Sequence, residues 1–310
     1  MTNVTASAVN RVAQAVSALF VPGDRPERFI KAQRTGADVI ILDLEDAVST
    51  ENKAVALAEI IAALTPTADG AVLTAMVRIS GTDALHELSA LAAVSSLPRH
   101  GLLGIMIPKA ESAEQVASVL HALPAGTPCI PLIESALGLV NVNEIARVPG
   151  VTRLAFGAVD FGLDVDATHS SIFDYARAQL VIGSAGAALA APFDSPCLSF
   201  KDLEIVAKES LRARESGCGG KLCIHPNQVA IVHHSFIPTP GQILWAHKVV
   251  ELEGGAAQLD GAMIDRPVVE RAKKILAVAH AASEAASHAA TEAATAMPAG
   301  AMPAGAEKTS

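Results

Sequence analysis

The feature that most constrains the fold is a recurring pattern of short apolar runs, rich in Val, Ile and Leu, separated by segments with helical periodicity. Continuous apolarity is typical of parallel strands that are covered on both faces. We expect about eight strand–helix units, the number that closes a TIM barrel. A doubly wound open sheet also alternates strands and helices, so the count leaves it as the alternative. The expected strands lie in the runs that begin at Ser17, Ala37, Ala71, Gly101, Thr127, Val151, Ala187 and Lys221.

Charged and special residues at the ends of these runs favour the barrel over the open sheet. Nearly every run ends at its C-terminal side in such a residue. In barrel enzymes the catalytic residues lie at the rim formed by the C-terminal ends of the strands. These residues are Asp24, Arg25, Glu45, Asp46, Arg78, Lys109, Glu134, Asp160, Asp194, His225 and Asn227. We therefore predict an α/β protein, a TIM (β/α)8 barrel with a C-terminal helical extension.

The expected domain boundaries follow from where the eight units begin and end. Residues 1–16 form an N-terminal segment, and residues 17–238 form the catalytic barrel. Residues 239–285 hold two amphipathic helical patterns beyond the eight units, and we expect this extension to lie in an oligomer interface. Residues 286–310 are rich in Ala, Pro and Gly and are predicted to be disordered.

Composition and charge exclude several classes of protein. With 51% hydrophobic and 18% charged residues the chain is typical of a buried-sheet enzyme, and 32 acidic against 23 basic residues argue against a nucleic-acid partner. The four cysteines lack C-x-x-C spacing and the N-terminus lacks a secretory pattern, so we expect a cytoplasmic protein. No apolar run approaches the roughly 18 to 20 residues that span a membrane, which predicts no membrane partner.

Glu134 and Asp160 are the residues whose setting most favours a metal ion. They end neighbouring expected strands, and neither has a basic residue beside it in the sequence. An unpaired carboxylate in a pocket costs roughly several kcal/mol. Mg²⁺ typically takes one or two protein carboxylates and completes its shell with water and substrate oxygens, so it is the natural partner. The alternative is a salt bridge across the rim to Arg78 or Lys109.

Arg78 ends its own apolar run and is a candidate for binding a substrate carboxylate. Its planar fork can grip a carboxylate through two hydrogen bonds, which an ammonium group cannot match. The alternative is an ion pair with Glu45 or Asp46, and both roles are compatible because an arginine oriented by a carboxylate is a better clamp. We assign Glu45 to orienting Arg78 and a metal-bound water, and leave Asp43 and Asp46 as structural candidates.

Seven ordered blocks between Leu19 and Ala282 carry a resemblance to a known family. The blocks are LFVPGDRPERFIKAQRTGADVIILDLEDAV, VRIS, GIMIPKAES, PLIESALGLVN, LAFGAVDFGLDV, GKLCIHPNQV and LDGAMIDRPVVERAKKIL. The chain resembles the HpcH/HpaI aldolase superfamily, in its citrate lyase beta-subunit-like branch. The resemblance implies a TIM barrel, Mg²⁺, and cleavage or formation of a carbon–carbon bond in a short acyl-CoA thioester of the citryl-, malyl- or citramalyl-CoA type. The other product is a small 2-oxo acid.

The resemblance also implies roles for single residues. Glu134 and Asp160 match the metal ligands, Arg78 matches the carboxylate-binding arginine, and Glu45 matches the acid near that arginine. Asp265 in the MID motif matches an acid that reaches a neighbouring subunit's site and acts in catalysis. A homo-oligomer, either a trimer or a hexamer, is therefore expected.

Three further residues are expected to line the same rim. Pro22 and His225 stand at strand ends, and Arg25 is assigned to the phosphates of coenzyme A. Taken alone, His225 could be a base, a ligand or a packed rim residue. The chain departs from the family pattern at Ser80, because the arginine is usually followed by one residue and then Asn. That departure concerns the substrate pocket and leaves the metal site untouched.

Three functions remain open at this level. The first is an autonomous acyl-CoA lyase, with or without thioesterase activity. The second is a citrate lyase beta subunit that acts on a citryl-acyl-carrier protein. The third is a non-catalytic barrel that binds CoA esters, or an aldolase of free 2-oxo acids.

Overall fold

The computed structural model describes residues 3–252, 257–259 and 262–295. It divides into two compact units, Met1–Phe236 and Ile237–Ser310. Each unit is described below by itself.

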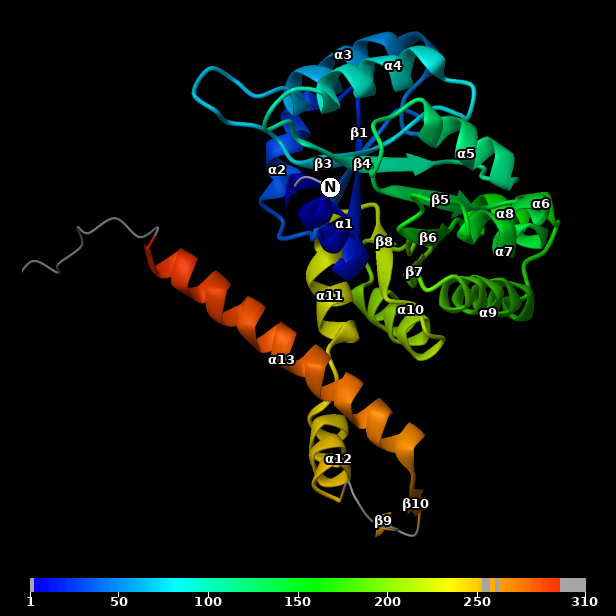
Figure 1. Cartoon of the computed structure of the whole chain (residues 1–310), viewed down its shortest axis with the longest axis vertical. Coiled ribbons are helices and arrows are strands. Elements are labelled where there is room, and N and C mark those ends of the chain that lie inside the picture. Colours follow the sequence, from blue (N-terminus) through cyan, green and yellow to red (C-terminus); the bar gives the residue numbers. More distant parts are fainter. Residues whose placement is uncertain (1–2, 253–256, 260–261, 296–310) are drawn as a thin grey trace, which may run out of the picture. The chain divides into compact units, whose positions relative to one another are not determined.

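In the first unit, eight parallel strands form a closed barrel in chain order, and β1 pairs with both β2 and β8 (Figure 1). Each expected apolar run holds one of these strands, and the predicted TIM barrel is confirmed. The strands are β1 (Ser17–Pro22), β2 (Val39–Asp43), β3 (Ala75–Arg78), β4 (Leu102–Ile107), β5 (Cys129–Ile133), β6 (Arg153–Phe156), β7 (Ala190–Asp194) and β8 (Gly220–Cys223).

Helices between the strands cover the outside of the barrel, and α1 (Asn3–Gln14) precedes β1. The others are η1 (Pro26–Arg28), α2 (Phe29–Gln33), η2 (Thr50–Asn52), α3 (Lys53–Leu64), α4 (Leu85–Ser95), α5 (Ala113–His121), α6 (Ala136–Val140), α7 (Val142–Ala146), α8 (Ala158–Asp164), α9 (Ser170–Gly186), α10 (Leu203–Glu215) and α11 (Pro226–Phe236). A capping box starts α5, since Ser112 and Gln115 exchange backbone and side-chain hydrogen bonds there.

Side chains of each strand alternate between two apolar layers. In β2, Ile40 and Leu42 join the layer between strands and helices, while Val39 and Ile41 join the layer inside the barrel. Both faces are apolar, which is why the strands read as continuous hydrophobic runs and not as alternating ones.

Helix α1 covers the N-terminal end of the barrel. Its Val12 and the following Ala15 belong to the interior apolar layer. Arg153, at the start of β6, donates from Nη1 to the carbonyls of Val12 at 3.3 Å and Ala15 at 2.5 Å. A cation beside the last carbonyls of a helix is favourable. The helix is therefore tied to this end, and the C-terminal ends of the strands form the opposite rim.

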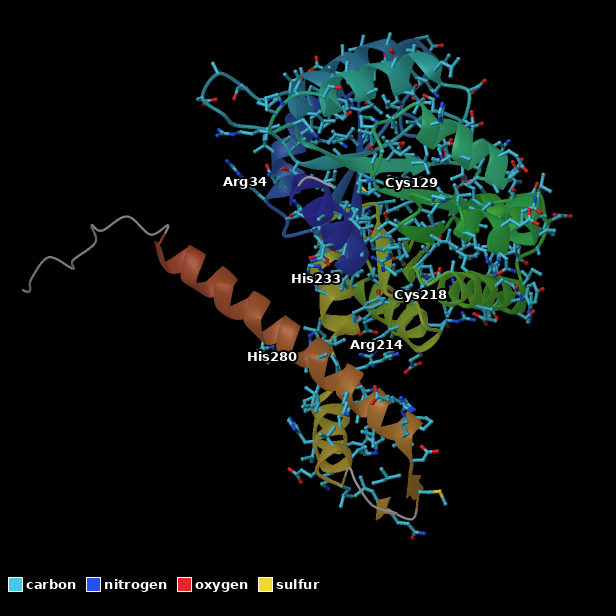
Figure 2. The ribbon with its side chains drawn as sticks, viewed as in Figure 1. Arg34, Cys129, Arg214, Cys218, His233 and His280 are labelled. Atoms are coloured by element: carbon cyan, nitrogen blue, oxygen red, sulfur yellow. The ribbon has the colours of Figure 1, made fainter. Side chains whose placement is uncertain are left out.

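Ser17, Asp38 and His233 meet at the same N-terminal end of the barrel. Figure 2 labels His233, which lies on α11. His233 Nε2 lies 2.8 Å from Ser17 Oγ and 2.9 Å from Asp38 Oδ2. A Ser–His–Asp triad needs the two partners on different ring nitrogens, whereas one nitrogen faces both here. The cluster therefore joins the ends of β1, β2 and α11 and is not a nucleophilic site.

The second unit contains α12 (Pro240–Glu251), β9 (Ala257–Leu259), β10 (Ala262–Ile264) and α13 (Arg266–Thr295). Its small apolar core is formed by Ala246, Val249, Ile264, Val269 and Ala272. Helix α13 continues past residue 286, where the disordered tail was expected to begin, and residues 296–310 of that tail lie outside the described residues. Within the described ranges, no helix is long and apolar enough to cross a membrane.

Candidate active site

Strand β2 ends in Asp43, whose side chain shapes the turn that follows. The carboxylate accepts the backbone N–H groups of Glu45 and Ala47, each at 3.0 Å. An aspartate that bonds amides two and four residues ahead stabilises a tight turn. Asp43 is 1% exposed, so this turn is fixed from beneath and presents Glu45 and Asp46 at the rim.

Arg78 ends β3 directly beside Asp43, its register partner. Its Nε donates to Asp43 Oδ1 at 2.6 Å and its Nη2 donates to Oδ2 at 2.7 Å. Burial by itself would lower the pKa of Arg78, but the hydrogen bonds and negative charges of Asp43 and Glu45 outweigh it and raise that pKa. Arg78 is therefore a permanently charged, oriented cation, and its guanidinium also lies 4.8 Å from the ring centre of Phe20.

Glu45 lies between two cations. Its Oε2 is 2.6 Å from Arg78 Nη1, and its Oε1 accepts a hydrogen bond from Lys109 Nζ at 2.9 Å. Burial raises the pKa of Glu45 in spite of these two positive neighbours. The contact of Oε2 with Arg78 lacks hydrogen-bond geometry, so Oε2 is a buried oxygen without a hydrogen-bond partner in the part of the chain that is described. Such an oxygen fits a water or ligand hydroxyl beside the arginine.

Glu134 follows β5 and is almost fully buried. Burial, aided by the charges of Glu45 and Asp160, raises the pKa of Glu134 to about 8, although a hydrogen bond from the Lys109 N–H at 2.8 Å opposes the rise. The backbone of Gly157 approaches so closely that a Cβ there would lie 2.5 Å from Glu134 Oε2. The carboxylate is thus confined, desolvated and repelled by two other acids.

Asp160 lies in the first turn of α8, near enough to Glu134 for its charge to raise that residue's pKa. No group of three or more His, Cys, Asp or Glu side chains with metal-binding geometry occurs among the described residues. Glu134 and Asp160 are therefore left as a pair of candidate carboxylate donors. A divalent cation that uses one or two carboxylates and completes its shell with water and substrate fits this pair, and it would relieve the repulsion that raises the pKa of Glu134.

The three rim residues proposed to bind substrate differ in their distance from the acids and arginine described above and in their contacts. Pro22 ends β1 as the register partner of Asp43, so it lies beside the acid–arginine pair. Arg25 is mostly exposed and lies 3.8 Å from Asp24. His225 stacks on Phe200 with 5.0 Å between ring centres and accepts the Asn227 N–H at Nδ1, which makes it a capping and packing residue in this geometry.

Asp265 lies in the second unit, immediately before α13. Its Oδ1 accepts the N–H of Val268 at 3.2 Å, so it caps the helix through one oxygen. Its side chain is exposed.

Two contributions were missed by sequence reasoning. Asp43 was left as a structural candidate, yet it supplies the two-pronged contact that orients Arg78. Lys109 was considered only as a salt-bridge alternative, whereas its amide bonds Glu134 and its ammonium bonds Glu45. Lys109 has a positive φ of 45° and bonds both acids. A positive φ in a non-glycine residue leaves no clear signal in the sequence.

With this geometry in place, comparison with known proteins assigns the family. The HpcH/HpaI aldolase/citrate lyase model matches residues 16–226. The chain belongs to this family. The resemblance predicted from the seven blocks is confirmed, and so is the prediction of a lyase at the level of the family.

Individual relatives cover most of the chain. A citrate lyase subunit beta-like protein of Deinococcus radiodurans is 32% identical over 84% of this chain and 95% of that protein. The mitochondrial citramalyl-CoA lyase of Rattus norvegicus is 29% identical over 86% of each. The crystal structure of protein CitE from Mycobacterium tuberculosis, in complex with magnesium, acetoacetate and coenzyme A, is similar with a TM-score of 0.73 and 29% identity. That similarity covers 86% of this chain and 98% of the other.

Proposed function

We propose that this protein is a Mg²⁺-dependent carbon–carbon lyase that acts on a short hydroxyacyl-CoA thioester bearing a carboxylate. The observation that carries the proposal is a chain of contacts from Glu134 to Arg78. Lys109 bonds Glu134 through its N–H and Glu45 through its ammonium group. Glu45 lies 2.6 Å from Arg78, which Asp43 holds by two hydrogen bonds. A paired anionic site beside an oriented cation is suited to a substrate that is itself both a metal chelator and an anion.

Glu134 and Asp160 are the residues that would hold Mg²⁺. When bound, the ion supplies Lewis-acid polarisation of the oxygen that becomes the product carbonyl. The magnesium in the similar CitE crystal structure supports Mg²⁺ as the ion. Lys109 keeps Glu134 Oε1 in place through its backbone N–H, so the ligand geometry is set before the ion arrives.

Arg78 would bind the carboxylate of the substrate. Asp43 occupies the edge formed by Nε and Nη2. Glu45 Oε2 lies 2.6 Å from Nη1, so a substrate carboxylate would share the terminal edge formed by Nη1 and Nη2 with Glu45. Because the guanidinium is already oriented and largely desolvated, little conformational entropy is lost when the ligand binds.

The reaction then requires a proton movement at each end of the breaking bond. In cleavage the hydroxyl gives its proton to solvent and its carbon becomes the carbonyl of the 2-oxo acid. The electron pair of the carbon–carbon bond passes to the thioester as an enolate. Protonation of the enolate carbon gives the acyl-CoA product. We assign the delivery of this proton to Asp265 of a neighbouring subunit. Its Oδ1 accepts the helix-cap hydrogen bond, so Oδ2 is the oxygen that would carry the proton.

The substrate class follows from the relatives and the site together. The citramalyl-CoA lyase and the coenzyme A complex of CitE support a CoA thioester as substrate. Two other Mycobacterium tuberculosis structures that this chain resembles, one with oxaloacetate and one with pyruvate, support a small 2-oxo acid as product. The assignment of Asp265 requires a homo-oligomer, for which we propose a trimer or hexamer. Arg25 remains our candidate for the coenzyme A phosphates.

A screen of thioesters tests the proposal. Purified protein is incubated with citryl-, malyl-, citramalyl- or methylmalyl-CoA, with Mg²⁺ or with chelator, and the 2-oxo acid, acyl-CoA and free coenzyme A are measured. The proposal expects equal amounts of a 2-oxo acid and an acyl-CoA from at least one thioester, in the presence of Mg²⁺ only. Release of free coenzyme A without a 2-oxo acid would indicate a thioesterase instead. Turnover confined to a citryl-acyl-carrier protein would indicate a citrate lyase subunit.

A further inference from the structure

Glu87 is a buried acid that the site described above does not use. It is 1% exposed and lies in the first turn of α4, three residues after Ala84 at the helix start. A glutamate at this position commonly bonds the backbone amide at the helix start. Both carboxylate oxygens of Glu87 contact Ser80 instead, seven residues earlier in the chain.

Ser80 connects Glu87 with the turn that follows β2. Its backbone N–H donates to Glu87 Oε2 at 2.8 Å, and its hydroxyl contacts Glu87 Oε1. The same hydroxyl oxygen lies 3.0 Å from the carbonyl oxygen of Leu44. Leu44 in turn donates its N–H to the carbonyl of Arg78 at 2.9 Å. Leu44, between Asp43 and Glu45, is therefore held through both its amide and its carbonyl by the end of β3.

We propose that Ser80 and Glu87 are positioning residues that set the grip of Arg78 on the substrate carboxylate. This inference rests on the proposed carboxylate-binding role of Arg78. The arginine is carried by β3, while the two acids that orient it stand on either side of Leu44. The contact between Ser80 and Leu44 fixes the distance between these two strand ends. A displacement of about 1 Å between reacting groups is enough to change binding and rate.

If Ser80 and Glu87 served only to start α4, they would need only some of these contacts. The bond from the Ser80 N–H to Glu87 closes the segment before the helix and involves no other strand. The hydroxyl reaches to Leu44 on the neighbouring strand end, so it adds a cross-strand contact. Ser80→Ala removes the cross-strand contact and the hydroxyl contact with Glu87 Oε1, and it keeps the bond from the Ser80 N–H to Glu87 Oε2. Ser80→Thr keeps the hydroxyl.

Glu87→Gln is the matched variant at the other partner. Its amide oxygen can still accept the Ser80 N–H, and its NH₂ group can donate to Ser80 Oγ, which remains free to donate to Leu44. We therefore expect near wild-type behaviour from Glu87→Gln and loss from Glu87→Ala. Ser95→Ala is the control on the same helix, because the Ser95 hydroxyl bonds only the Ala92 carbonyl of α4 among the described contacts.

Two measurements on the full-length protein test the inference. Hydrogen–deuterium exchange of the peptide around residues 42–48 should be about threefold to tenfold faster in Ser80→Ala, as expected for one lost hydrogen bond, and unchanged in Ser95→Ala. Calorimetric titration with pyruvate and with oxaloacetate, in saturating Mg²⁺, should show Kd raised by a similar factor in Ser80→Ala and restored in Ser80→Thr. The affinity for Mg²⁺ alone should not change.

The outcomes separate this inference from the proposed function. Equal exchange and equal Kd in Ser80→Ala and wild type overturn the inference. Faster exchange with an unchanged Kd also overturns it, because the contact would then serve the fold alone. A wild-type protein that binds neither 2-oxo acid counts against the proposed function, and the exchange comparison still decides whether Ser80 holds the turn.

Discussion

Asp43 and Arg78 face each other on neighbouring strands and share two hydrogen bonds, Nε to Oδ1 at 2.6 Å and Nη2 to Oδ2 at 2.7 Å. Asp43 also accepts two amides of the turn that presents Glu45. One buried carboxylate therefore fixes the direction of the arginine and the shape of the turn beside it. This pre-organisation reduces the ordering that a bound carboxylate would otherwise require.

Asp43→Asn is predicted to lower both activity and stability. It removes the charge of the two-pronged partner and leaves the buried guanidinium paired with Glu45 alone. Removing one member of a buried ion pair typically costs about 3 to 5 kcal/mol, and the remaining Glu45 contact should reduce this loss. We expect kcat/KM to fall at least about tenfold and Tm to fall measurably. The matched control is Asp46→Asn, since Asp46 is 59% exposed and lies 3.7 Å from Arg78. Equal effects of the two changes would contradict the special role of Asp43.

Arg78→Lys keeps the positive charge but loses the planar fork. The single ammonium group of lysine cannot bond Asp43 at two points and also present a second pair of donors to a substrate carboxylate. We predict a loss in kcat/KM of at least about tenfold, equivalent to roughly 1.4 kcal/mol, carried mainly by the affinity for the 2-oxo acid. Steady-state kinetics in the condensation direction measure it. Unchanged kinetics would make Arg78 a structural ion-pair partner only.

The sequence predicted those features that depend on residues close together in the chain. Apolar runs predicted the strands because both faces of a parallel barrel are buried, and the position of Glu134, Asp160 and Arg78 at run ends predicted a common rim. The register of β2 against β3 was not readable in this way. That register decides that Asp43, and not Glu45, makes the two-pronged contact with Arg78.

Other parts of the site depend on backbone conformation or on long-range contacts. The φ of 45° at Lys109 turns its amide toward Glu134 and its side chain toward Glu45. The contact of Ser80 with Leu44 spans two strand ends that are separated in the chain. Neither leaves a periodic signal, so pattern and propensity arguments could not have found them.

The raised pKa of Glu134 predicts a pH dependence with a definite sign. In the protein without metal, the folded state holds a proton on Glu134 up to about pH 8, whereas the unfolded chain loses it near its ordinary value of about 4.3. This contribution to stability is therefore present below the unfolded value and is lost as pH rises toward about 8.

Mg²⁺ competes with that proton, so its affinity should increase as pH rises toward about 8 and then level off. The difference in Tm between Mg²⁺ and chelator, measured from about pH 5.5 to about pH 8.5, should grow with pH in the wild type. Glu134→Gln should show a much smaller and flatter difference. A constant Mg²⁺ effect across this range in the wild type would contradict the assignment.

Asp265 is predicted to act in the site of a neighbouring subunit. Asp265→Asn should be inactive while retaining its fold, because an amide oxygen still accepts the Val268 N–H but cannot carry the proton. Mixing inactive Asp265→Asn subunits with inactive Glu134→Gln subunits should restore some activity, since shared sites regenerate wild-type pairs. No recovery despite proven subunit exchange, or an active Asp265→Asn protein, would leave Asp265 as a helix cap.

The most direct test of the central claim follows both products of a single thioester in matched variants. With the thioester that the screen identifies, the wild type should form a 2-oxo acid and an acyl-CoA in equal amounts, and chelator should stop the reaction until Mg²⁺ is restored. Glu134→Gln and Asp160→Asn, with circular dichroism spectra like the wild type, should each form neither product at any Mg²⁺ concentration tested, because each lacks one anionic ligand. Full turnover in both variants, or in chelator, would contradict a magnesium-dependent lyase built on these two carboxylates.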